Sequence, residues 1–93
     1  MQGEKILTLH PEGKTRKNIE IEKYYLMKKF IIQCLNKKEL TFTEILNETK
    51  RKLKNKFKGS IPWYLETVKL DLEARKIIKR IKNTKPQKYK SII

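Results

Sequence analysis

Two helix-start signals lie close together in the middle of the chain and limit the folds open to it. Thr41-Phe-Thr-Glu44 matches a capping box, in which a threonine hydroxyl and a glutamate carboxylate each accept a hydrogen bond from an otherwise unpaired backbone N–H. Ser60-Ile-Pro62 is a second start, because serine is a favoured N-cap and proline is tolerated in the first helical turn. Gly59 is expected to end the helix that starts at the capping box. The sequence therefore predicts two consecutive helices joined by a short connection that contains glycine.

An earlier helix is predicted from about Glu20 to Asn36, where apolar residues recur at helical spacing. Its apolar arc is wider than one contact face requires, so we expect the N-terminal strand or a second copy of the chain to cover part of it. The third helix is expected to reach about Arg75. The inward positions of the second and third helices are expected to be Leu46, Thr49, Leu53, Phe57, Ile61, Leu65, Val68 and Leu72.

Short strands are expected around these helices. Lys5–His10 is typical of a strand, which the turn residues Pro11–Gly13 close, and residues 14–18 are expected to form a basic connector. Leu40 and Phe42 alternate like a second, brief strand before the capping box. These segments predict one strand before the first helix and one after it.

The C-terminal segment predicts a β-hairpin, with strands at Ile77–Ile81 and Gln87–Ser91 and a turn at Lys82–Pro86. The order strand, helix, short strand, helix, turn, helix, hairpin is mainly α with small β, and it is the order of a winged helix-turn-helix. We expect one domain over residues 1–93. Residues 1–18 would hold the N-terminal strand and connector, residues 20–76 the three-helix core and residues 77–93 the wing hairpin.

The sequence also resembles small, stand-alone winged-helix proteins of uncharacterised function from bacteria and archaea. The segments that carry the resemblance are Leu7–Lys14, Gly59–Tyr64, Val68–Arg75, Ile78 and Lys85–Tyr89, so it spans nearly the whole chain. The resemblance implies the fold, but it supplies no ligand or activity. This chain departs from the pattern at Lys76, where such sequences often have a glycine that ends the third helix in a left-handed turn.

The net charge of +14 is gathered in two stretches of the chain. Residues 50–58 carry six bases and no acid, the chain after Glu73 carries eight bases and no acid, and the remainder balances ten bases against ten acids. This distribution predicts two electropositive surfaces, although lysine-rich genome composition is an alternative explanation. We expect folding to place them side by side as one platform for a polyanion.

A cationic platform on a winged-helix scaffold predicts binding of nucleic acid, with DNA favoured over RNA, and a role in transcription regulation. Arg51, Lys54 and Lys58 are expected to share one side of the second helix, and Lys82 and Lys85 to occupy the wing tip. The full set of candidate contacts is Lys50, Arg51, Lys54, Lys58, Lys69, Lys79, Arg80, Lys82, Lys85 and Lys88.

The outward face of the third helix does not fit simple reading of base edges, which favours Arg, Lys, Asn or Gln. By helical spacing this face holds Trp63, Glu66, Thr67, Leu70, Glu73 and Ala74. The alternative function is therefore a protein-interaction or dimerisation module that uses Trp63, Glu66, Leu70 and Glu73. A core-capping role for Trp63 is a further alternative.

The sequence offers little for catalysis. His10 is the only histidine and precedes Pro11 in a turn, and Cys34 is the only cysteine and has apolar neighbours. The acids show no metal-ligand spacing, so we expect no enzyme activity, no metal, no cofactor and no small-molecule substrate. The chain has no apolar run of membrane-spanning length and no secretory signal, which predicts a cytoplasmic protein without a membrane partner.

Overall fold

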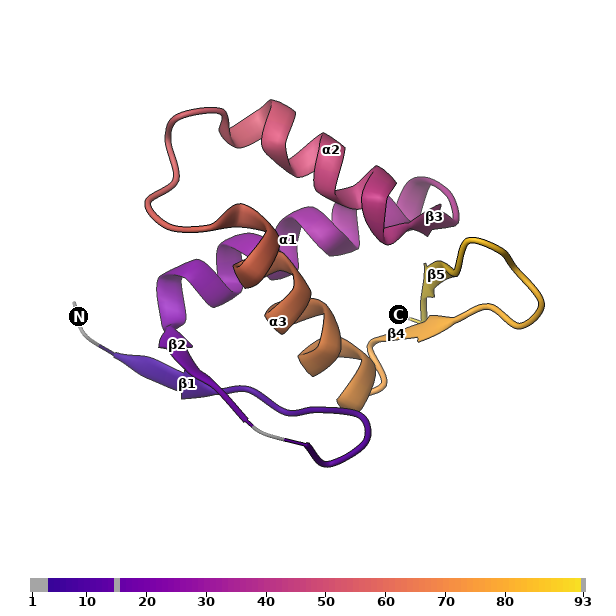
Figure 1. Ribbon diagram of the computed structural model, residues 1–93, viewed down its shortest axis with the longest axis horizontal. Coiled ribbons are helices and arrows are strands. Elements are labelled where there is room, and N and C mark those ends of the chain that lie inside the picture. The colour runs from indigo at the N-terminus through magenta and orange to yellow at the C-terminus, as the bar shows by residue number, and fades with distance from the viewer. Residues whose placement is uncertain (1–3, 15, 93) are drawn as a thin grey trace.

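The computed structural model describes residues 4–14 and 16–92, which form an α+β fold of three helices and two small antiparallel sheets (Figure 1). The described part measures 40 × 31 × 21 Å along its principal axes. Among its helices, none combines the length and apolarity that crossing a bilayer requires. The elements are β1 (Lys5–Leu7), β2 (Asn18–Glu20), α1 (Ile21–Lys37), β3 (Leu40–Thr41), α2 (Phe42–Leu53), α3 (Ile61–Ala74), β4 (Ile78–Arg80) and β5 (Lys88–Ser91).

The hydrophobic core lies where the three helices meet. Met27 and Ile31 of α1, Ile45 of α2 and Leu65 of α3 are fully buried there. The predicted inward stripe of α3 is confirmed, because Leu65, Val68 and Leu72 are buried and Ile61 packs at the edge of the core. Burying this apolar surface is the main driving force that fixes the three helices against one another.

Helix α2 begins as predicted but ends earlier than predicted. The Thr41 hydroxyl accepts a hydrogen bond from the Glu44 N–H at 3.2 Å, and the Glu44 carboxylate accepts one from the Thr41 N–H at 2.8 Å. The helix ends at Leu53, because Lys54 has a φ of +46° and turns the backbone out of the helix. The predicted stop at Gly59 is therefore wrong, and Phe57 lies in the connecting loop rather than on α2.

Helix α3 begins at the predicted serine cap, where the Ser60 hydroxyl accepts a hydrogen bond from the Trp63 N–H at 3.2 Å. It ends at Ala74, close to the predicted Arg75. Lys76 then adopts a φ of +62°. The left-handed turn associated with glycine at this position is thus present with a lysine, at some cost in backbone strain.

The N-terminal segment forms a hairpin rather than the predicted strand and connector. β1 pairs with β2 antiparallel, with Ile6 opposite Ile19. Beyond the strands, the Thr8 hydroxyl donates a hydrogen bond to the Lys17 carbonyl at 3.0 Å. β2 was missed because it has only three residues, with one buried apolar position at Ile19, and its polar-apolar alternation runs directly into the start of α1 at Ile21. The hairpin packs on α1 and covers part of its wide apolar arc.

The predicted C-terminal hairpin is present. β4 and β5 pair antiparallel, with Lys79 opposite Lys90, and the brief strand β3 pairs with the other edge of β5, where Leu40 lies opposite Tyr89. The sheet order is therefore β3-β5-β4. Ile78, Tyr89 and Leu40 are buried, so the inner face of this sheet closes one side of the core.

Candidate nucleic-acid interface

The two basic stretches lie at opposite ends of the molecule (Figure 1). We use wing or wing end as a label for residues 78–91, which form the β4–β5 hairpin, and wing sheet for the sheet β3-β5-β4; residues 50–60 are the loop end. In Figure 1 the loop end lies on the left and the wing end on the right, with α3 running between them. The expected single platform is therefore wrong. The physical reason is the direction of α2: it starts beside β5 and its 12 residues carry the chain about 18 Å away from the wing sheet.

The outer face of the wing sheet carries three lysines. Lys79 lies directly opposite Lys90, and Lys88 shares their face because side chains alternate along β5. Within the residues that the structure describes, no ion pair involves any of the three. Like charges placed directly opposite each other destabilise a sheet. This face is thus strongly electropositive, and the fold maintains it at a cost.

Lys90 was not among the candidate contacts taken from the sequence. Its place on the outer face follows from the register with Lys79, which the sequence does not specify. The alternation Lys88-Tyr89-Lys90, with an aromatic residue between two bases, is the signal that could have identified it.

Lys82 and Lys85 lie exposed in the loop between β4 and β5, as expected for a wing tip. Hydrogen bonds within the loop support its shape. The Ile81 carbonyl accepts from the Thr84 hydroxyl at 3.0 Å and from the Gln87 amide at 2.8 Å. The two lysines therefore project from an ordered turn that extends the basic face of the sheet.

Lys69 does not lie where a phosphate contact requires. Its side chain is 3% exposed, and its ammonium group donates hydrogen bonds to the Glu73 carboxylate at 3.0 Å and the Tyr89 hydroxyl at 3.1 Å. Burial disfavours the charged form, but the bonds to Tyr89 and Glu73 outweigh it and raise the pKa of Lys69. The expectation that Lys69 contacts nucleic acid is wrong, because its ammonium group is buried and already bonded to Glu73 and Tyr89.

Glu73 connects α3 to the wing. Its side chain is 7% exposed, and besides Lys69 it accepts a hydrogen bond from the Arg80 guanidinium at 2.7 Å. Arg80 is half exposed and is the one candidate base of the wing that is paired with an acid in the described structure. The Glu73 carboxylate thus fixes the base of the wing, and it does not lie on an open face of α3 as predicted.

A second buried acid, Asp71, joins three parts of the chain. Its carboxylate accepts hydrogen bonds from the Tyr24 hydroxyl, from the Leu9 N–H at 2.8 Å and from the Arg75 guanidinium at 2.9 Å. Burial and the bond to Asp71 raise the pKa of Tyr24 far above its ordinary value. Asp71 therefore ties α1 and the N-terminal hairpin to the half of α3 nearest the wing.

At the loop end the bases are exposed and largely free of acids. Within the described residues no ion pair involves Lys50, Lys54 or Lys58, whereas Arg51 pairs with Glu48 at 2.8 Å. The prediction that Arg51, Lys54 and Lys58 share one side of α2 is wrong, because the helix ends before Lys54 and Lys58. Of the bases at this end, Lys50 and Lys54 line a shallow depression together with Phe57.

The exposed face of α3 is narrower than predicted. Trp63 is 43% exposed and the Glu66 side chain is 48% exposed, with Leu70 half-buried beside them. Thr67 is buried, like the Glu73 side chain, so neither belongs to an open outward face. The wing and the N-terminal hairpin cover the second half of the helix, which leaves Trp63 and Glu66 as the residues open to a partner.

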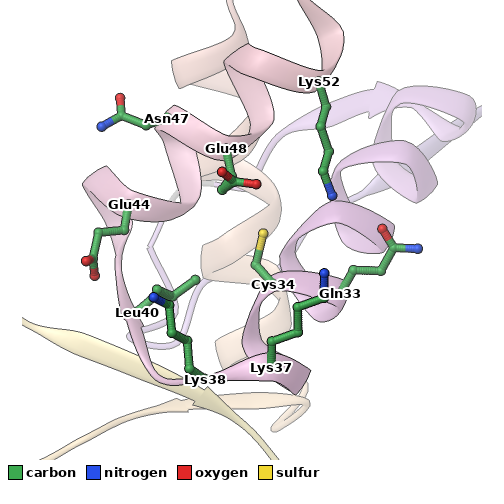
Figure 2. A pocket seen from close by; sticks show the side chains of 9 residues that line it. All are labelled: Gln33, Cys34, Lys37, Lys38, Leu40, Glu44, Asn47, Glu48 and Lys52. Atoms are coloured by element: carbon green, nitrogen blue, oxygen red, sulfur yellow. The ribbon is translucent and has the colours of Figure 1, made fainter.

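A cleft of about 330 Å³ lies between α1 and α2, and the side chain of Cys34 points into it (Figure 2). Burial raises the pKa of the Cys34 thiol, which disfavours the nucleophilic thiolate. The walls carry charges of both signs, including Lys37, Lys52 and Glu48. A thiol in this state, without a positioned base, is not arranged for nucleophilic catalysis.

The remaining groups with catalytic or ligating chemistry are scattered. His10 accepts a hydrogen bond at Nδ1 from the Glu12 N–H at 3.0 Å, a local bond within the turn. Over residues 4–14 and 16–92, no three His, Cys, Asp or Glu side chains come together as potential metal ligands.

The comparison with known proteins identifies a family. No curated protein and no solved structure matches the chain. The model of a family of unknown function (DUF6958) matches residues 5–89, a span that runs from β1 into β5 and includes the first basic stretch and all of the second except Lys90. The expectation of an uncharacterised family is confirmed at this level. The chain belongs to this family of unknown function.

Proposed function

We propose that this protein is a non-enzymatic, cytoplasmic winged-helix protein that binds nucleic acid, with duplex DNA as its main target, and that it acts as a transcription regulator. The observation that carries the proposal is the lysine face of the wing sheet, formed by Lys79, Lys88 and Lys90, none of which forms an ion pair within the described residues. Because the loop end lies elsewhere, binding to duplex is led by the wing and needs no second platform.

The order of elements supports the winged-helix assignment. α1, β3, α2, α3, β4 and β5 follow one another, and the sheet order β3-β5-β4 places the hairpin beside the short strand that precedes α2. α2 and α3 correspond to the two helices of a helix-turn-helix. Their connection of seven residues, 54–60, is longer than the usual three or four.

The charge pattern supports a backbone-led mode of binding. Phosphates meeting Lys79 and Lys90 would relieve the repulsion between the two ammonium groups and release condensed counterions. The open part of α3 offers Trp63 and Glu66, which are poor readers of base edges in the major groove. Binding of this kind positions the protein on the duplex with weak sequence preference.

The test is a fluorescence-anisotropy titration of labelled duplex DNA across a range of salt concentrations. With five wing contacts (Lys79, Lys82, Lys85, Lys88 and Lys90), log affinity should fall against log salt with a slope of about −4.5. The Lys79→Gln/Lys90→Gln variant should reduce the magnitude of this slope by about 2. The control Lys5→Gln/Lys29→Gln makes the same change in net charge on β1 and α1, and it should leave the slope unchanged.

Three results would overturn the proposal: no binding at micromolar protein, binding that does not depend on salt, or equal effects of the wing and control variants. Competition with a duplex RNA of the same sequence tests the choice of polymer. Tighter binding to RNA would replace DNA as the main target.

A second candidate function is protein interaction or dimerisation through α3. The exposed indole of Trp63 beside Leu70 favours it, because large apolar side chains are enriched at interfaces. Glu73 no longer contributes to this candidate, since its carboxylate is engaged by Lys69 and Arg80. Sedimentation of a Trp63→Ala/Leu70→Ala variant discriminates: an unchanged mass and unchanged partner recovery would count against this function.

A further inference from the structure

We infer that the loop end is a stacking site for unpaired bases of single-stranded nucleic acid, built on Trp63 and supplied with charge by the loop lysines. This inference extends the proposed function to a second surface at the other end of the molecule. It rests on the proposed function because both claims require a nucleic-acid ligand. The two surfaces can be tested separately, because one is expected to bind a single strand and the other a duplex.

Three aromatic rings form a continuous ladder at this end. The rings of Phe57 and Tyr64 meet edge to face with centroids 5.3 Å apart, and those of Tyr64 and Trp63 do so at 4.9 Å. The ladder becomes more exposed along its length, since Phe57 and Tyr64 are half-buried and Trp63 is 43% exposed. An exposed aromatic ring beside positive charge is the kind of surface on which bases stack in proteins that bind single strands.

The loop backbone is shaped around this ladder. Gly59 has a φ of +116°, and a Cβ atom at this position would lie 2.9 Å from the Tyr64 ring. The Ser60 hydroxyl holds the Trp63 N–H, which fixes the first turn of α3 against the loop. The backbone that carries Trp63 and Tyr64 is therefore fixed before any ligand arrives, which lowers the entropy cost of binding there.

The charge around the ladder selects an anionic partner. Lys54, Lys56 and Lys58 are exposed in the loop, and within the described residues none of them forms an ion pair. The ammonium group of Lys23 lies 4.8 Å from the centre of the Tyr64 ring, but it is paired with Glu20 at 3.0 Å, so the free charge at this site comes from the loop lysines. Interfaces between proteins are depleted in lysine, whereas a strip of lysines beside exposed aromatic rings suits a phosphate backbone with unstacked bases.

The choice of a single strand follows from the position of the indole. Bases in a duplex present their edges in the grooves, and their faces are stacked on one another. A ring at the surface of the protein can stack only on a base whose face is free, as in a single strand, a loop or a duplex end. Such stacking tolerates any base, so the site would show little sequence preference.

Trp63 is the only tryptophan of the chain, so its fluorescence reports this site directly. The probes are a short oligothymidylate and the same strand paired with oligoadenylate. The single strand should quench the emission of Trp63. Trp63→Leu should weaken binding of the single strand by about 10-fold while duplex affinity stays unchanged, and Trp63→Phe should retain most of the affinity, because a phenyl ring still stacks.

Tyr25→Leu is the matched control, since Tyr25 is also an exposed aromatic residue but lies on α1. It should affect neither ligand. Melting curves of all variants establish that each is folded at the assay temperature, and binding is compared by anisotropy of the labelled strand.

The outcomes separate the two claims. Equal affinities of wild type, Trp63→Leu and Trp63→Phe for the single strand, with duplex binding intact, would overturn this inference alone. Loss of a dimer in sedimentation of Trp63→Leu would also overturn it, because the indole would then belong to an interface between copies. Single-strand binding that depends on Trp63 without salt-dependent duplex binding would support this inference and overturn the wing-led proposal.

Discussion

The wing end and the loop end are both rich in bases, but the wing end is a β-hairpin and the loop end is mostly irregular backbone. Each comes from a stretch of chain rich in bases and free of acids. At the wing end, acids from α3 neutralise part of the charge: Glu73 holds Lys69 and Arg80, and regular strands set the remaining lysines in register. At the loop end, no ion pair within the described residues involves Lys54 or Lys58. The chain leaves α2 at Lys54, which has a positive φ of +46°.

This difference teaches that charge density alone does not define a binding surface. On the wing sheet the strand register sets Lys79, Lys88 and Lys90 on one face, and under the proposed function this face meets the phosphates of a duplex. The loop presents cations on irregular backbone beside exposed rings, which suits a flexible strand with free bases. The following predictions test whether the two ends differ in what stabilises them as well as in what they bind.

The largest effect is expected from Asp71→Ala, which removes the acid beneath the wing half of α3. The Tyr24 hydroxyl and the Leu9 N–H would lose their acceptor and Arg75 its partner, and we expect a loss of about 3 kcal/mol in the free energy of unfolding. Urea denaturation measures it. Glu48→Ala removes the exposed acid nearest the loop end and should cost far less. Equal losses of stability in Asp71→Ala and Glu48→Ala would contradict the claim that a buried acid stabilises the wing end more than an exposed acid stabilises the loop end.

The next largest effect is expected from Gly59→Ala at the loop end. An alanine there must adopt a φ of +116° and place its Cβ atom 2.9 Å from the Tyr64 ring, so we expect a loss of about 1–2 kcal/mol and a changed Trp63 emission. Gly13→Ala is the control, because its φ is +72° and the space around it is open. If the loss at Gly59 does not exceed that at Gly13, the loop does not hold the aromatic ladder as described.

A smaller effect of opposite sign is expected from Lys79→Glu on the wing. The new carboxylate would face Lys90 across the strands, so stability should rise by about 0.5 kcal/mol at low salt while affinity for duplex DNA falls. The gain should shrink as salt is added. Lys58→Glu at the loop end has no such cross-strand partner and should give no gain. A gain at Lys58, or none at Lys79, would show that register does not distinguish the two ends.

The smallest effect is expected in the stability of the protein at low pH, and it depends on Glu44. The backbone N–H of Thr41 donates to the Glu44 carboxylate and lowers its pKa from the ordinary value of 4.5. The stability that this bond supplies is therefore present above pH 4.5 and is lost as the pH falls through the lower pKa of the folded state. Glu44→Gln should show a shallower decline in the urea midpoint below pH 4.5 than the wild type.

Ser60→Ala provides the contrast at the loop end, because the first turn of α3 contains no Asp or Glu that would titrate in the acid range. Its loss of stability should be about the same at every pH. A pH-dependent loss at Ser60, or an unchanged acid profile in Glu44→Gln, would contradict this difference between the two helix starts.

Much of the fold could be predicted from local pattern. The caps at Thr41 and Ser60, the spacing of apolar residues in the helices and the hairpin at residues 77–91 are all present in the structure. These features depend on interactions between residues close in sequence, which a pattern expresses directly. The early end of α2 at Leu53 was missed because a lysine, Lys54, takes the left-handed conformation.

The candidate site was less predictable. Lys69 and Glu73 are four residues apart on α3, a spacing at which the two side chains can pair, but the sequence does not show that Tyr89 and Arg80 of the wing contact and help to bury them. The alternation Lys88-Tyr89-Lys90 could have identified Lys90 as a candidate, but its position opposite Lys79 depends on a strand register that the sequence does not specify. β2 was missed because its pairing with β1 carries too little apolar pattern to be detected.

The sequence by itself determined where helices begin, which segment forms the hairpin, and that the excess charge falls in two stretches, because each depends on neighbours along the chain. Only the tertiary structure decided which charges remain free and where they lie. The direction of α2 carries one basic stretch away from the wing, and the packing of the wing on α3 buries Lys69. Such distances between distant segments are set by how helices and strands pack, and a linear pattern does not contain them.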